Sequence, residues 1–280
     1  MQTYVSIFAA AIVSMAAMVE PAPAHDPSLY PDWSGQWGRG REGGVPRYDP
    51  SKPLRRQEAP LKPEYKARHE ASMRDIDAGG FGTDNNYRCF PSTMPRTMSG
   101  VSVLEFVISS SMTHILFEQM TFSPRRIYTD GRSFPANLEP TFVGYSIGKW
   151  TDTDGDGRYD TLEVETRNIR GPKLWDQTGM PMADDNEAVI TERLYLDKSN
   201  PNILRNEMTT TDNSLTRPWS VLKSYRRSKD VVWVDFSCTE GNRYVVIEGQ
   251  TYVLAGDGKL MPTRKDQPPP DLRYFNQTRK

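Results

Sequence analysis

The acidic and glycine residues between Asp152 and Glu163 form the clearest chemical pattern in the chain. Read as a twelve-residue loop, DTDGDGRYDTLE has oxygen-bearing side chains at positions one, three, five, nine and twelve, and glycine at position six. This fills the side-chain positions of the EF-hand calcium pattern. Calcium takes about six to eight oxygen ligands, so we expect a structural calcium ion in this loop. We expect no organic cofactor. The predicted metal ligands are Asp152, Asp154, Asp156, the carbonyl of Arg158, Asp160 and Glu163.

The residues on either side of this loop differ from those of an EF-hand. SIGKW before the loop and TLEVETRNI after it are typical of β-strands, whereas an EF-hand loop joins two helices. We therefore expect the loop inside a β-hairpin. The alternative is an acidic, solvated Asp-Gly turn without an ion.

A second polar group offers a different chemistry. Arg125 and Arg126 adjoin a strand, and the guanidinium fork suits a planar anion such as a carboxylate or a phenolate. Tyr145 or Glu192 would then be available to move a proton. We predict Arg125, Arg126 and Tyr145 as ligand contacts, and Tyr145, Glu192 and Arg126 as catalytic candidates. The alternative is a set of cross-strand ion pairs on a solvated sheet face.

The start of the chain resembles a secretory signal peptide. Residues 4–19 are apolar and uncharged, and Ala22-Pro23-Ala24 forms an A-x-A cleavage pattern. The apolar run is shorter than the ~20 residues needed to span a bilayer, which favours cleavage over an uncleaved anchor. We expect residues 1–24 to be removed and the mature protein to be periplasmic or secreted, with no membrane insertion.

The two cysteines, Cys89 and Cys238, are the only ones in the chain. An oxidising compartment favours a disulfide between them, and the alternative is two free buried thiols. A paired cysteine is not a nucleophile, and the sequence contains no serine-nucleophile elbow, zinc-protease helix motif or nucleotide-binding glycine pattern.

The elements that would hold these residues are mostly strands. Beyond Pro95, short segments rich in β-branched and aromatic residues alternate with turn residues, which predicts an all-β fold. We expect an antiparallel β-barrel or a strongly curved, lipocalin-like meander, and a dry sandwich is the alternative. The clearest predicted hairpin joins residues 188–196 to 203–211 through DKSNPN.

The region before the strands is rich in Pro and Gly. It is expected to be an arm with one short helix in PEYKARHEASMRDIDAG, and its tryptophans are expected to be packing anchors. The predicted organisation is a signal peptide over residues 1–24, an arm over 25–88, a barrel domain over 89–261 and a flexible tail over 262–280.

Several segments resemble motifs of a family of exported, largely uncharacterised bacterial all-β proteins. They are PSTMPRTM, RRIYTDGRSFP, VGYSIGKW, DTLEVETRNI, AVITERLYL and LTRPWS. Relatives in that family carry cysteines near both ends of this region, which agrees with the expected disulfide. They often have His at the positions of Phe134 and Tyr145, and a short turn in place of the calcium loop.

The formal net charge of −1, with Lys and Arg spread along the chain, argues against nucleic acid as the main partner. The function we favour is binding of a small apolar or aromatic molecule in the mouth of the barrel. One alternative is a cofactor-independent lyase or isomerase that uses Arg, Tyr and Glu side chains in the same pocket. A second is an envelope or surface interaction protein without a pocket. The sequence does not define the oligomeric state.

Overall fold

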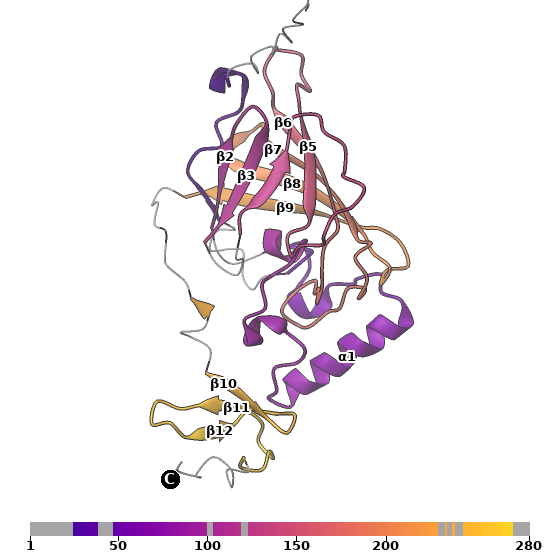
Figure 1. The fold of residues 1–280 in the computed structure, drawn as a ribbon, viewed down its shortest axis with the longest axis vertical. Helices are drawn as coiled ribbons and strands as arrows, with labels where there is room; N and C mark the ends of the chain where they lie inside the picture. Colours follow the sequence, from indigo (N-terminus) through magenta and orange to yellow (C-terminus); the bar gives the residue numbers. More distant parts are fainter. Residues whose placement is uncertain are drawn as a thin grey trace, which may run out of the picture.

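The structure is a computed structural model. A barrel of strands forms its upper part, the helix α1 lies below the barrel, and a small sheet lies below the helix (Figure 1). The expected signal peptide lies outside the described residues. The structure describes residues 25–38, 47–99, 103–118, 123–228, 233, 237–238 and 243–270.

Nine strands form a closed barrel in chain order, and β1 closes it by pairing with both β2 and β9. The predicted all-β barrel is therefore confirmed. The strands are β1 (Gln36–Gly38), β2 (Leu104–Ile108), β3 (Met112–Phe117), β4 (Arg125–Tyr128), β5 (Tyr145–Thr151), β6 (Thr161–Arg167), β7 (Val189–Asp197), β8 (Asn200–Thr211) and β9 (Trp219–Arg227).

The expectation of an antiparallel barrel needs one correction. β4 and β5 run parallel, with Ile127 opposite Ser146 and Tyr128 opposite Ile147. A parallel pair requires a crossover connection, and residues 129–144 provide it. The remaining strand pairs of the barrel are antiparallel.

The predicted hairpin between β7 and β8 is present, but its turn is shorter than expected. Leu196 pairs with Leu204, and after a register shift Asp197 pairs with Asn200. The Asp197 carboxylate accepts hydrogen bonds from the Ser199 amide at 3.0 Å and from Arg205 Nε at 2.9 Å. These contacts stabilise a tight turn, so residues that were expected in the loop belong to the strands.

The helix α1 (Pro63–Asp77) occupies the predicted position, with a proline at its start and Gly79 at a positive φ just after its end. It packs on the segment after β6, where Ser72 donates a hydrogen bond to the Thr178 carbonyl and His69 Nε2 lies 2.8 Å from Thr178 Oγ1. The short 3-10 turns are Pro27–Leu29, Leu54–Arg56, Asn85–Arg88 and Arg96–Ser99.

The last strands form a separate sheet and do not extend the barrel. They are β10 (Tyr244–Ile247), β11 (Gln250–Leu254) and β12 (Leu260–Pro262). The barrel strands therefore run from β1, inside the segment expected as an arm, to β9, whereas the predicted barrel region covered residues 89–261. The strand expected over residues 231–238 and the last part of the expected tail, residues 271–280, lie largely or wholly outside the described residues.

Large side chains fill the barrel between its two ends. Toward the β5–β6 loop, Trp33 packs against Phe106 and Trp150, with ring centroids 4.9 and 4.8 Å away. Toward the other end, Tyr48, Trp175 and Trp219 form a second aromatic cluster. Trp33 and Trp37 are 1% and 0% exposed, which confirms them as packing anchors.

Candidate functional site

Arg125 lies inside the barrel, where a complete set of polar partners surrounds it. Its guanidinium donates to Glu192 as an ion pair, to Thr166 Oγ1 at 2.8 Å and to Ser146 Oγ at 3.2 Å. Asn206 Nδ2 donates to Glu192 Oε1 at 2.9 Å. Both charged side chains are fully buried, so this network compensates the cost of removing two charges from water. The arrangement is that of a structural polar centre.

Arg126 and Tyr145 lie on the opposite, outer face of the sheet. Arg126 is exposed, and Tyr145 stacks on Tyr128 with ring centroids 4.8 Å apart. Successive side chains of a strand point to opposite faces, so adjacent arginines cannot enter one lumen together. The three predicted ligand contacts therefore do not share a site, and neither do the catalytic candidates, because Glu192 is inside the barrel.

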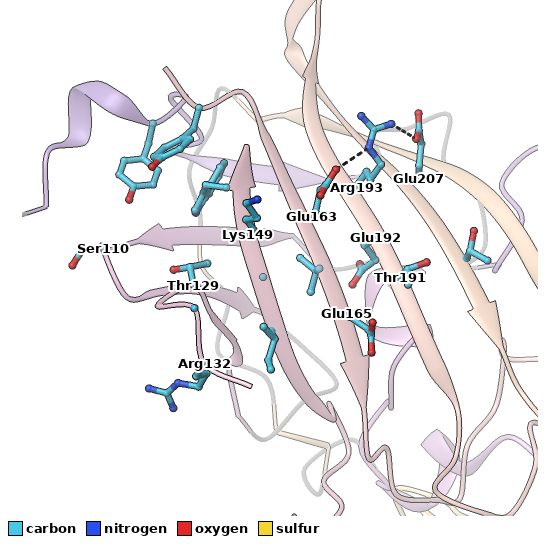
Figure 2. A pocket seen from close by; sticks show the side chains of 18 residues that line it. Ser110, Thr129, Arg132, Lys149, Glu163, Glu165, Thr191, Glu192, Arg193 and Glu207 are labelled. Carbon is cyan, nitrogen blue, oxygen red and sulfur yellow. Dashed lines mark hydrogen bonds and ion pairs between the residues drawn. The ribbon is translucent and has the colours of Figure 1, made fainter. Parts of the chain in front are cut away.

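An open groove of about 840 Å³ lies on the outer face of β5 to β8. Its floor consists of outward-facing, mostly polar side chains of these strands, and Figure 2 shows the charged residues Lys149, Glu163, Arg193 and Glu207 along it. Its rim includes Ser110, from the β2–β3 turn, and residues just after β4. The polar rim residues labelled in Figure 2 are Ser110, Thr129 and Arg132.

The carboxylates on the floor are engaged by arginines. Arg193 lies 3.8 Å from Glu163 and 3.0 Å from Glu207, so it bridges two strands (Figure 2). Glu207 also accepts a hydrogen bond from Tyr195 at 2.7 Å, and Glu165 pairs with Arg167. These residues lie at outward positions on adjacent strands, where opposite charges stabilise the sheet.

One end of the groove is aromatic. Tyr30 packs edge-on against Trp150 at 5.4 Å and in a tilted arrangement against Tyr159 at 5.1 Å, and all three residues line the groove. The Tyr159 amide donates to the Leu29 carbonyl at 2.7 Å, which ties the β5–β6 loop to the N-terminal segment. Burial, followed by the charge of Tyr159, raises the pKa of Tyr30, so its phenol stays protonated at neutral pH.

The predicted calcium loop lies beside this aromatic end. Carboxylate oxygens of Asp152, Asp154 and Asp156 lie within 4.8 Å of one another, and the three side chains are exposed. The Asp152 carboxylate accepts hydrogen bonds from the amides of Gly155 and Gly157 at 2.7 and 2.9 Å. The Gly157 amide has the largest effect in lowering the pKa of Asp152. The loop therefore gathers three carboxylate side chains, which supply oxygen donors of the kind that calcium prefers.

The remaining predicted ligands lie differently. Asp160 accepts hydrogen bonds from the amide and hydroxyl of Thr153, at 3.1 and 2.5 Å. The Arg158 amide donates to Asp156 at 2.8 Å. Glu163 belongs to β6, where its carboxylate faces Arg193 on the neighbouring strand. The structure thus brings together three of the predicted side-chain ligands and separates Glu163 from them.

The predicted disulfide is confirmed. Cys89 and Cys238 are bonded, with their Cα atoms 5.6 Å apart and a sequence separation of 149. The bridge connects the segment after α1 to the chain beyond β9, which leads to the separate sheet of β10 to β12. It therefore joins parts of the chain that share no barrel strand.

Comparisons with known proteins do not extend this description. No protein-family model, curated protein or solved structure matches the chain. In the part of the chain that the structure describes, no helix has the length and apolar character needed to cross a membrane.

The sequence reasoning missed the groove. Its floor consists of the polar half of alternating strands, a pattern that is also typical of cross-strand ion pairs on a solvated sheet face. The sequence contains no signal that Tyr30, near the N-terminus, packs against Trp150 and Tyr159 and so forms the aromatic end. The polar alternation of residues 161–167 and 189–197 was visible, but it does not show which outer face is hollowed.

Proposed function

We propose that this protein is an exported binding protein that takes a small aromatic molecule in the groove over β5 to β8. The observation that carries the proposal is the aromatic end formed by Tyr30, Trp150 and Tyr159, which adjoins a polar floor. The volume of about 840 Å³ lies in the range of small-molecule sites, and such sites combine aromatic walls with a few placed polar groups.

The groove is a better candidate than the barrel interior. The interior contains a satisfied ion pair between two aromatic clusters, and its large side chains are almost completely buried. A ligand there would have to displace packed tryptophans. The groove is open, and Tyr30 and Tyr159 are only partly buried in it.

Two features support export. The first is the signal-like start of the chain, and the second is the disulfide, because such bonds persist in oxidising compartments. The periplasm or the extracellular space is therefore the proposed location.

The proposed calcium ion has a structural role in the β5–β6 loop. Asp152, Asp154 and Asp156 would supply carboxylate oxygens, and the ion would reduce the repulsion between them. The same loop carries Tyr159, so a calcium ion that orders the loop would also hold one wall of the groove.

A lyase or isomerase is less well supported than binding. That alternative requires Tyr145, Glu192 and Arg126 in one pocket, and the sheet separates Glu192 from the other two. The alternative of an interaction protein without a pocket does not account for the groove.

The test is calorimetric titration with 2-naphthamide, a neutral aromatic probe. We expect wild type to bind it and Tyr159→Ala to bind about threefold to tenfold more weakly, because an aromatic pair contributes ~0.5–1.5 kcal/mol beyond its area. Tyr65→Ala, in α1, is the matched control and should bind as wild type does. Absence of binding at millimolar probe, or equal weakening in both variants, would contradict the proposal.

A further inference from the structure

We infer that the groove selects an aromatic ligand carrying a negative charge, and that Lys149 binds the anionic group. This inference rests on the proposed function, because it assigns a chemical class to the ligand of the same groove. The ligand class is a planar aromatic carboxylate or a similar monoanion.

The charges of the groove leave one cation available. Glu163 and Glu207 both face Arg193, Glu165 pairs with Arg167, and the Arg132 guanidinium is 2.6 Å from Asp130. Among the described residues, Lys149 has no ion pair or hydrogen bond from its amino group. It is therefore the charged side chain on the floor that can accept a ligand group without losing a partner.

The position of Lys149 suits this role. It is an exposed, outward-facing residue of β5, and it lines the same groove as Tyr30 and Tyr159 of the aromatic end. Figure 2 shows Lys149 on the floor, with Glu163 on the adjacent strand joined to Arg193. A ligand whose ring packs at the aromatic end would thus have a cation within the same groove. The lysine ammonium acts as a compact charge with three donors, which suits a carboxylate.

A cationic ligand is less compatible with the groove. It would have to compete with Arg193 for Glu163 and Glu207, because that guanidinium lies between both carboxylates. It would also approach the Lys149 ammonium, which lies opposite Glu163 in the strand register without forming an ion pair with it. An anion meets a free cation and displaces no existing ion pair.

The experiment compares two ligands that differ in charge and little in shape, 2-naphthoate and 2-naphthamide. At neutral pH the carboxylate is ionised and the amide is neutral. We expect wild type to bind the carboxylate about fivefold more tightly, as an exposed ion pair allows, and the preference to fall as salt rises. Lys149→Met should bind both ligands equally, and Lys149→Arg should retain the preference.

The matched control is Lys259→Met, because Lys259 is an exposed lysine just before β12, in the separate C-terminal sheet. It should preserve the wild-type preference. If both ligands bind wild type with equal affinity, or if Lys149→Met keeps the preference, the inference is wrong and the proposed function stands. If neither ligand binds, the proposed function itself fails, and this inference fails with it.

Discussion

At the residue scale, Arg125 and Arg126 show how two adjacent arginines acquire different roles. Arg125 and Ile127 are buried, whereas Arg126 is exposed, as strand alternation requires. The segment RRIY contained this information, since the apolar Ile127 marks the inward face and Arg125 shares it. The sequence did not show that Glu192, in a distant segment, would be the partner of Arg125.

The buried ion pair leads to a stability prediction for Glu192→Gln. This substitution keeps the shape of the side chain but leaves Arg125 as a buried charge without a counterion. We expect the free energy of unfolding to fall by ~3–5 kcal/mol. Urea unfolding measures it, and a shifted midpoint with an unchanged slope would identify a pure loss of stability.

The control for this prediction is Glu165→Gln, on the outer face of β6. Its partner Arg167 is half exposed, so we expect a change of less than ~1 kcal/mol. Similar small losses in the two variants would show that the interior pair is not a stabilising centre.

At the element scale, the β5–β6 hairpin shows that a loop motif can predict a metal ligand that the following strand directs elsewhere. The twelve-residue pattern predicts Glu163 as the last ligand, because the helix after an EF-hand loop turns that residue back toward the ion. Here the residue belongs to a strand that leads away from the loop, and Glu163 faces Arg193. The motif predicted the loop and the three aspartates that converge in it. The strand geometry directs Glu163 toward Arg193, away from those aspartates.

The calcium prediction uses this difference. In wild type, calcium at about a hundredfold above Kd should stabilise the fold by ~2.7 kcal/mol relative to chelator. Sites in exported proteins often bind at ~0.1–1 mM, so at millimolar calcium we expect a smaller gain of about 0.4–1.4 kcal/mol. Asp156→Ala should lose the shift in unfolding temperature, because it removes a converging carboxylate.

Glu163→Gln should keep most of the calcium shift, since Glu163 lies outside the aspartate cluster. Thermal unfolding with excess calcium and with chelator measures all three proteins. An identical unfolding temperature for wild type under both conditions would make the loop an acidic turn.

The other elements show where local sequence signals were sufficient. Pro63 and Gly79 mark the ends of α1, because a proline suits the first turn and a glycine suits the left-handed residue after a helix. The parallel pairing of β4 with β5 has no local signal. It depends on the path of residues 129–144, and turn residues in that segment are compatible with either direction.

At the scale of the whole molecule, the barrel is closed by a strand from the N-terminal segment. We expected residues 25–88 to be an arm, but Trp37 lies in β1, which pairs with β2 and β9. A three-residue strand is too short for periodicity to reveal. The tryptophans were recognised as buried, whereas the pairing that buries them depends on contacts between distant parts of the chain.

Because the barrel is closed and its interior is filled by side chains, a ligand is expected on its outer surface. The strands' inward side chains form the core, so their outward side chains and the N-terminal segment provide the groove. We therefore propose the groove, with Tyr30 and Tyr159 as one wall, as the ligand site in place of the barrel mouth that the sequence suggested.

The most direct test of this account is the position of bound 2-naphthamide. Intermolecular nuclear Overhauser effects report protons in direct contact between the ligand and the protein. We expect contacts from the naphthyl ring to the rings of Tyr30 and Tyr159, and none to the methyl groups of Leu194, which is fully buried in the barrel. Contacts to Leu194 without contacts to the tyrosines would place the ligand in the barrel interior and contradict the account.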